Sequence, residues 1–178
     1  AGYNSTSSYN NTSVGSNALL SNITGSNNTA LGAGTLCFNT DGNANLAIGS
    51  SALGSGTTGN YNVAIGSQSL YNNTNDYNTA VGNSSGINDT LGSYNTYLGF
   101  YANVDSSANL YQYSTAVGYN AIIKGSNQIV LGGKNNDDSM YPDIIINGDL
   151  TVTGASTLTG DLAVTGASTL TGDLALTG

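Results

Sequence analysis

A short apolar phrase that ends in glycine recurs along the chain up to residue 133. In each repeat the residue before the glycine is aliphatic, the residue before that is usually Ala, and polar turn residues fill the rest. The recurring glycines are Gly15, Gly32, Gly49, Gly66, Gly82, Gly99, Gly118 and Gly132. Neighbouring members of this series lie 14 to 19 residues apart, and most lie 17 apart. Spacing this regular predicts a repeat fold in which every coil meets the same packing problem.

Each phrase has the length and composition of a short strand, in which alternate residues face opposite sides. We expect the aliphatic residue, such as Ile48, to point into a core, and the flanking Ala47 and Gly49 to point away from it. The Leu that follows four residues after several of the glycines, as in Leu36 and Leu53, is expected to supply a second strand and a second row of core. About 17 residues with two strands and two turns predict one coil of a narrow, parallel β-roll solenoid of about eight coils.

Asparagine forms a second column, four residues before the glycine in most repeats. Its members include Asn28, Asn45, Asn62 and Asn78. Identical amides stacked coil upon coil can hydrogen-bond to one another or to the backbone of the turns. We therefore favour a structural role for this column over a binding role.

A different repeat begins after Gly133. Residues 134–148 contain the only proline and an Ile-rich run, and they are predicted to form a junction or neck. From residue 149 to 178 glycine recurs every six residues, which favours a thin β shaft in which three copies intertwine. A hexapeptide β-helix is the alternative for this part. The predicted organisation is thus a roll at 1–133, a junction at 134–148 and a shaft at 149–178, as one piece of a longer fibre.

Composition excludes several classes of function. The chain lacks Glu, Arg, His and Trp, and its only cations are Lys124 and Lys134, so ten Asp give a net charge of −8. Loss of these helix-forming residues predicts an all-β chain. Nucleic-acid binding and a polybasic membrane contact both need cations, and no apolar run is long enough for a membrane span. The lone Cys37 is expected to be a small buried hydrophobe rather than a reactive or disulfide-bonded thiol.

No catalytic set is visible in the sequence. Without His or Glu, a Ser-His-Asp triad is impossible and general acid–base chemistry would fall to Asp, Lys or Tyr. We therefore expect no enzyme activity and no cofactor. The neighbouring Asp137 and Asp138 are a weak calcium candidate because they lie in an oxygen-rich segment, but the segment lacks the spacing of a known calcium loop. A solvated turn is the preferred interpretation of these two residues.

Tyrosine gathers where the repeat lengthens to 19 residues. Aromatic rings with hydroxyl tips suit sugar rings or protein surfaces, so these tyrosines are candidates for receptor binding. The alternative is that they pack over one another and seal an irregular turn. The candidates are Tyr94, Tyr97, Tyr101, Tyr111, Tyr113 and Tyr119.

The phrases NTALGAGTL, NLAIGSSAL, NVAIGSQSL and NTAVGNSSG, closed by SNQIVLGG, resemble the head repeats of YadA-like trimeric adhesins. They look closer still to the related β-roll repeats of trimeric phage tail fibres. The similarity covers about Asn11 to Gly133. It implies a left-handed roll and a homotrimer of three rolls packed side by side. The unit is longer than the common adhesin repeat, and the chain carries neither the membrane-anchor barrel nor the coiled-coil stalk of those adhesins.

These observations together predict a structural fibre or adhesin segment, outside the cell, on a virion tail fibre or a cell-surface appendage. It would give reach and multivalent attachment to a glycan or protein receptor, with neither nucleic acid nor membrane insertion as part of its work. A self-assembling filament or surface-layer component without a receptor is the second hypothesis. An ice- or crystal-binding solenoid is a weaker third, because Thr does not form a regular flat ladder through the roll.

Overall fold

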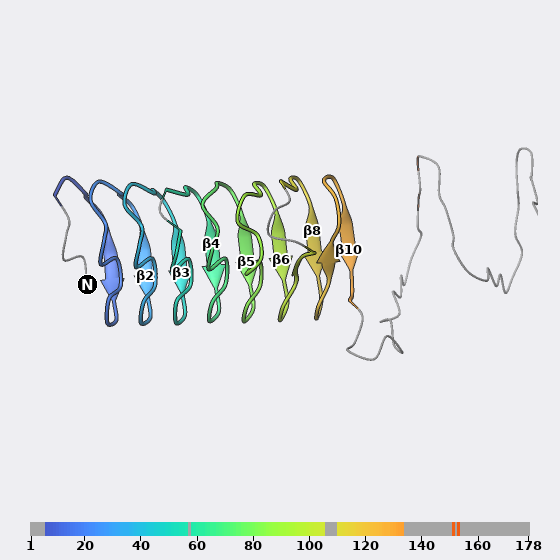
Figure 1. The fold of residues 1–178 in the computed structure, drawn as a ribbon, viewed down its shortest axis with the longest axis horizontal. Helices are drawn as coiled ribbons and strands as arrows, with labels where there is room; N and C mark the ends of the chain where they lie inside the picture. The colour runs from blue at the N-terminus through green and yellow to red at the C-terminus, as the bar shows by residue number, and fades with distance from the viewer. Residues whose placement is uncertain (1–5, 57, 106–109, 134–150, 152, 154–178) are drawn as a thin grey trace, which may run out of the picture. The chain divides into compact units, whose positions relative to one another are not determined.

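Eight short parallel strands, one from each coil, form the main sheet of the chain. In this computed structural model, residues 6–56, 58–105, 110–133, 151 and 153 are described. The strands of the sheet are β1 (Thr12–Val14), β2 (Thr29–Leu31), β3 (Leu46–Ile48), β4 (Val63–Ile65), β5 (Thr79–Val81), β6 (Thr96–Leu98), β8 (Thr115–Val117) and β10 (Ile129–Leu131). Figure 1 shows them side by side in chain order, joined by turns at both ends. Within the described ranges there is no helix, and hence none that could span a membrane.

Every strand pairs in parallel with the strand of the next coil, at the register that the repeat dictates. Ala30 lies opposite Ala47, and Ala47 lies opposite Ala64. The pairing survives the longer coil of 19 residues, where Thr96 lies opposite Thr115. The predicted all-β parallel solenoid is therefore confirmed, with about seven turns of about 17 residues.

The sides of the strands are the reverse of what the sequence analysis predicted. The small residue at the centre of each strand points into the roll: Ala30, Ala47 and Ala64 are fully buried. The aliphatic residue beside it points outward, and Leu31 remains 46% exposed. The interior is narrow and is already occupied by a row of leucines and a row of asparagines from the rest of each coil, so only a small side chain fits at the central position. The prediction that Ile48 and its equivalents form the core is wrong.

The row of leucines after the glycine does lie in the core, as predicted, but mostly not on a strand. Leu36 and Leu53 are buried within turns, and both have the left-handed backbone conformation, with φ of +49° and +48°. That conformation costs about 1–2 kcal/mol for a residue with a Cβ. Burial of a leucine side chain contributes about 1.5–3 kcal/mol, so burial outweighs the strain. The predicted second strand occurs only as β7 (Asn103–Val104), which pairs with β9 (Ile122–Ile123).

The recurring glycine marks the same bend in every coil, as predicted. Gly66 has a φ of +133°, and a Cβ built on it would lie 2.3 Å from the carbonyl oxygen of Gly82 in the next coil. Both the backbone conformation and the close approach of the next coil therefore require glycine at this position.

The asparagine column is a hydrogen-bonded ladder inside the roll. The side-chain oxygen of Asn28 accepts the backbone N–H of Asn45 at 3.0 Å, and that of Asn45 accepts the N–H of Asn62 at 2.9 Å. Each side-chain amide also donates to a turn carbonyl, as Asn28 does to Gly42 at 2.7 Å. The same pattern continues through Asn78 to Asn95. The predicted structural role of the column is confirmed.

The predicted junction at 134–148 and almost all of the shaft at 149–178 lie outside the described residues. The calcium candidates Asp137 and Asp138 fall there too, so nothing is said of their surroundings. The lone Cys37 is half-buried rather than fully buried, and burial raises the pKa of its thiol.

Replacing Gly66 with Ala is expected to destabilise the roll by about 3 kcal/mol or more, because the methyl group meets backbone atoms that have no room to move. Gly34→Ser is the matched control. Gly34 also has a positive φ, but a Cβ there approaches only the Ser51 hydroxyl, at 3.3 Å, and Ser51 itself adopts a φ of +57°. Denaturant unfolding followed by circular dichroism measures both. Equal losses for the two variants would contradict the close-approach account.

Candidate ligand-binding surface

Four tyrosines stack on one another along the outside of the roll, one from each of four successive coils. We call Tyr61, Tyr77, Tyr94 and Tyr113 the tyrosine ladder. Their ring centroids lie 5.0, 4.9 and 4.9 Å apart, with interplanar angles of 3°, 7° and 14°. All four remain exposed, between 45% and 58%. Partial burial against its neighbours raises the pKa of Tyr77, and the charges of Tyr61, Tyr94 and Asp76 add to that shift.

All four ladder residues sit five positions before the recurring glycine, at the residue that leads into the buried asparagine. The backbone there is left-handed in every coil, with φ between +55° and +61°. In the coils outside the ladder the position holds Asn10, Asn27, Ala44 and Asn127. Asn tolerates this conformation far better than Tyr, so the ladder is built where an aromatic residue is conformationally costly.

The six sequence-predicted tyrosines are therefore divided. Tyr94 and Tyr113 belong to the ladder, whereas Tyr101 and Tyr119 lie with Phe100 in a second exposed aromatic group. Tyr111 is half-buried and packs against the core. Tyr61 and Tyr77 were missed, although their constant distance from the glycine could have revealed them.

Tyr97 does not lie on the surface. It occupies the interior position that Ala holds in the neighbouring coils, and its side chain is fully buried. Its ring takes the space of a leucine, because Gly86 stands where the other coils have Leu36, Leu53 or Leu70. A Cβ on Gly86 would lie 2.9 Å from the Tyr97 ring. Tyr97 is thus a core residue, and the prediction that it contacts a receptor is wrong.

Asp89 is the buried partner of Tyr97. The Tyr97 hydroxyl donates to its carboxylate at 2.7 Å, and the Gly92 N–H and the Asn95 amide donate to it at 2.7 and 3.2 Å. Burial raises the pKa of Asp89, and these three hydrogen bonds oppose that shift without cancelling it. Burial and the neighbouring carboxylate also raise the pKa of Tyr97. Asp89 stands in a column that holds Asn22, Asn39 and Asn73 in other coils, a departure that the sequence could have revealed.

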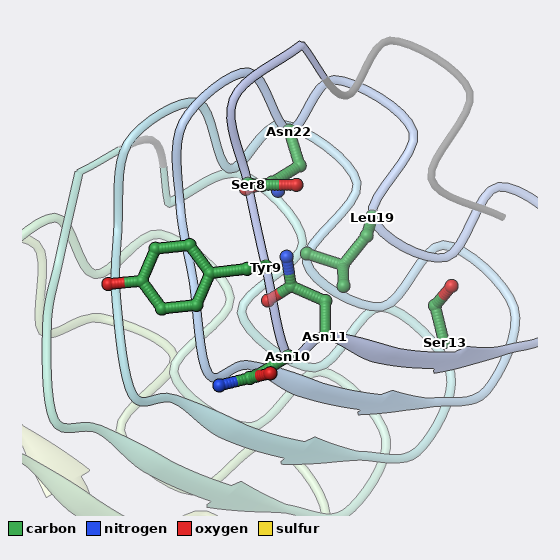
Figure 2. Close-up of a pocket in the computed structure, with 7 residues that line it drawn as sticks. All are labelled: Ser8, Tyr9, Asn10, Asn11, Ser13, Leu19 and Asn22. Atoms are coloured by element: carbon green, nitrogen blue, oxygen red, sulfur yellow. The ribbon is translucent and has the colours of Figure 1, made fainter.

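A small cavity of about 280 Å³ lies at the first described coil (Figure 2). It is lined mainly by polar side chains, among them Ser8, Asn10, Asn11 and Asn22, with Leu19 on one wall. The ring of Tyr9 points away from the other labelled side chains in this view. This is the end face of the stack, where Asn11 begins the ladder of amides, and its lining carries neither a carboxylate nor a cation.

The described part of the chain holds no group of three or more His, Cys, Asp or Glu that could bind a metal ion. Comparison with known proteins adds no assignment: no family model, curated protein or solved structure matches the chain. What the structure itself presents is a rigid stack of coils with a row of exposed tyrosines on its surface.

The paired departure at Tyr97 and Gly86 predicts a non-additive effect. Tyr97→Ala alone should cost about 3–5 kcal/mol, since it leaves a cavity. Gly86→Leu alone should also destabilise, because the new side chain meets the Tyr97 ring. The double variant recreates the pair that Leu70 and Ala80 form one coil earlier, so its loss should be smaller than the sum by about 2 kcal/mol or more. Additive losses in denaturant unfolding would contradict this packing.

The buried Asp89 predicts a pH-dependent contribution to stability. Because burial raises its pKa in the folded state, the stability it contributes is fully present below the pKa of the unfolded chain and is lost as pH rises through the folded pKa. We expect the stability of the wild type relative to Asp89→Asn to increase as pH falls from about 7 towards about 4. The exposed Asp41, changed to Asn, is the control. A relative stability that decreases over the same range would overturn the assignment.

Proposed function

We propose that the chain is the β-roll segment of a homotrimeric extracellular fibre of the YadA-like, phage tail-fibre type, and that it attaches to cell surfaces. The observation that carries the proposal is an aliphatic strip on the outside of the main sheet. We define the aliphatic strip as Val14, Leu31, Ile48, Ile65, Val81, Leu98, Val117 and Leu131.

The strip runs without interruption from β1 to β10, one residue from each strand. Val14, Leu31, Leu98 and Leu131 are about half exposed, and the other four are partly buried. The outward residues at the other end of each strand are Thr, Val, Leu or Ile, so this face of the sheet carries no charge. Monomeric proteins seldom expose a continuous apolar surface of this kind.

Copies of the same chain are the natural partners for this strip. Each copy presents the same uncharged residues at the same coil spacing, so the strips of neighbouring rolls can pack coil against coil. Homo-oligomers with closed symmetry are the commonest arrangement of such self-complementary surfaces. Three copies around one axis is the arrangement that the resemblance to YadA-like repeats implies, and it would leave the tyrosine ladder to be tested as a receptor-binding surface.

Charged residues placed in the strip should separate the copies without unfolding each roll. We expect the wild-type chain to have a mass of three times 17.9 kDa in solution, and the variant Leu31→Asp with Leu98→Asp to have the mass of one chain. Leu91→Asp, at an exposed leucine outside the strip, is the control and should stay trimeric. Light scattering after size-exclusion chromatography measures the masses, and circular dichroism checks the fold. A wild-type monomer would contradict the proposal.

Attachment is tested with the same proteins. The fluorescently labelled trimer is expected to bind intact bacterial cells of at least one type in a panel, and to bind them about a hundredfold more tightly than the strip variant does, since three linked sites act together. Electron microscopy of the unlabelled protein is the companion measurement. Continuous filaments, together with an absence of binding across the panel, would favour the filament hypothesis instead.

A further inference from the structure

We propose that the tyrosine ladder binds a neutral, extended, β-linked glycan that lies along the stack with one sugar ring beside each tyrosine. The proposal names the receptor class for the attachment described above, and in that sense it rests on the proposed function. It differs from the sequence-based prediction, because two of its four residues are new and Tyr97 is excluded from it.

The first argument is the shape of the surface. Four rings from four coils stand at 4.9–5.0 Å intervals and form a straight, continuous row. The row is set by strand pairing and is therefore rigid and preformed, which lowers the entropic cost of binding. A ligand that uses every member of the row must itself be extended and must repeat at a similar interval. An extended β-linked glycan has both properties.

The second argument is the conformational cost of the ladder. Each ladder tyrosine adopts a left-handed backbone, with φ between +56° and +61°, at a cost of about 1–2 kcal/mol. Stacking between neighbouring rings returns about 0.5–1.5 kcal/mol per pair, so the three pairs at most offset the strain of four residues. Stability alone therefore does not account for tyrosine where Asn10, Asn27 and Asn127 serve in other coils. Strain that is retained without a gain in stability indicates a functional surface.

The third argument is charge. The chain has a net charge of −8, and Asp76 lies beside the ladder, where it accepts hydrogen bonds from Asn60. A glycan with carboxylate, sulfate or phosphate groups would be repelled from this surface, and bidentate arginine recognition of such groups is impossible in a chain without Arg. The ligand is therefore an uncharged glycan. Its hydroxyl groups can both donate to and accept from the phenolic hydroxyls, and its C–H groups can pack against the ring edges.

The experiment measures binding of neutral β-1,4-linked oligosaccharides, the hexamers of glucose and of N-acetylglucosamine, to the full chain by isothermal titration calorimetry. At least one hexamer should bind about tenfold more tightly than its own disaccharide, because it reaches more rings. The variant Tyr77→Asn with Tyr94→Asn should weaken hexamer binding by about tenfold or more. Asn is the residue that this position holds in other coils, so the fold should be retained.

The matched control is Tyr101→Asn. Tyr101 is also exposed and also left-handed, with a φ of +55°, and Asn17 and Asn120 occupy the equivalent position in other coils. It lies outside the ladder, so hexamer affinity should change less than about twofold. Variants with Tyr77→Phe and Tyr94→Phe separate the hydroxyl contribution from that of the ring, and each should weaken binding by less than the Asn variant does.

Four results would overturn the proposal: neither hexamer binds, affinity does not increase with chain length, the Asn variant binds as well as the wild type, or the Asn variant loses its oligomeric state. The last would make the ladder an interface between copies of the chain. The cell-binding assay distinguishes this failure from failure of the proposed function. Attachment that persists in the Asn variant overturns the ladder alone, whereas hexamer binding without attachment to any cell supports the ladder and contradicts the proposed function.

Discussion

The hydrogen-bonded column of asparagines inside the roll is the interaction on which the other features depend. Each buried amide accepts a backbone N–H from the next coil and donates to a turn carbonyl, as Asn45 does with Asn62 and Gly59. A buried amide left without these partners would cost about 1–3 kcal/mol. Because the partner always belongs to the following coil, no coil is complete alone, and the spacing of the repeat cannot drift. Strand register, the glycine bends and the positions of surface side chains are all fixed by this column.

The same column makes the interior too narrow for large aliphatic residues on the strands. Alanine fills the remaining space, and the aliphatic residue beside it is turned outward. The roll thus presents apolar surface along one side of its sheet instead of burying it, which links its internal packing to association between copies. Regular stacking also places equivalent residues of successive coils above one another, so four tyrosines at one position become a single aligned surface. A property of the interior therefore determines what the exterior can do.

Much of the fold could be predicted from the sequence, because the period, the glycine bends, the leucine row and the asparagine ladder are all visible as columns. The direction of the strands' side chains could not. Alternation in Leu46, Ala47 and Ile48 shows that two faces differ, but not which of them is inside, and the usual preference for buried aliphatic residues gave the wrong answer. The second strand failed because left-handed residues such as Leu36 leave no signature when burial compensates their strain. Tyr97 was misplaced because its meaning depends on Gly86, a residue distant in sequence and different in kind.

Amide hydrogen exchange at the asparagine column tests the central claim most directly. Asn28, Asn45, Asn62 and Asn78 precede their strands, so in an ordinary loop their backbone N–H groups would exchange within seconds. If the column is a continuous buried ladder, these four amides should exchange as slowly as those of the strand centres, through global unfolding. Exchange at the rate of an unprotected loop, with the strand amides still slow, would show that the coils are held by strand pairing alone and would contradict the account.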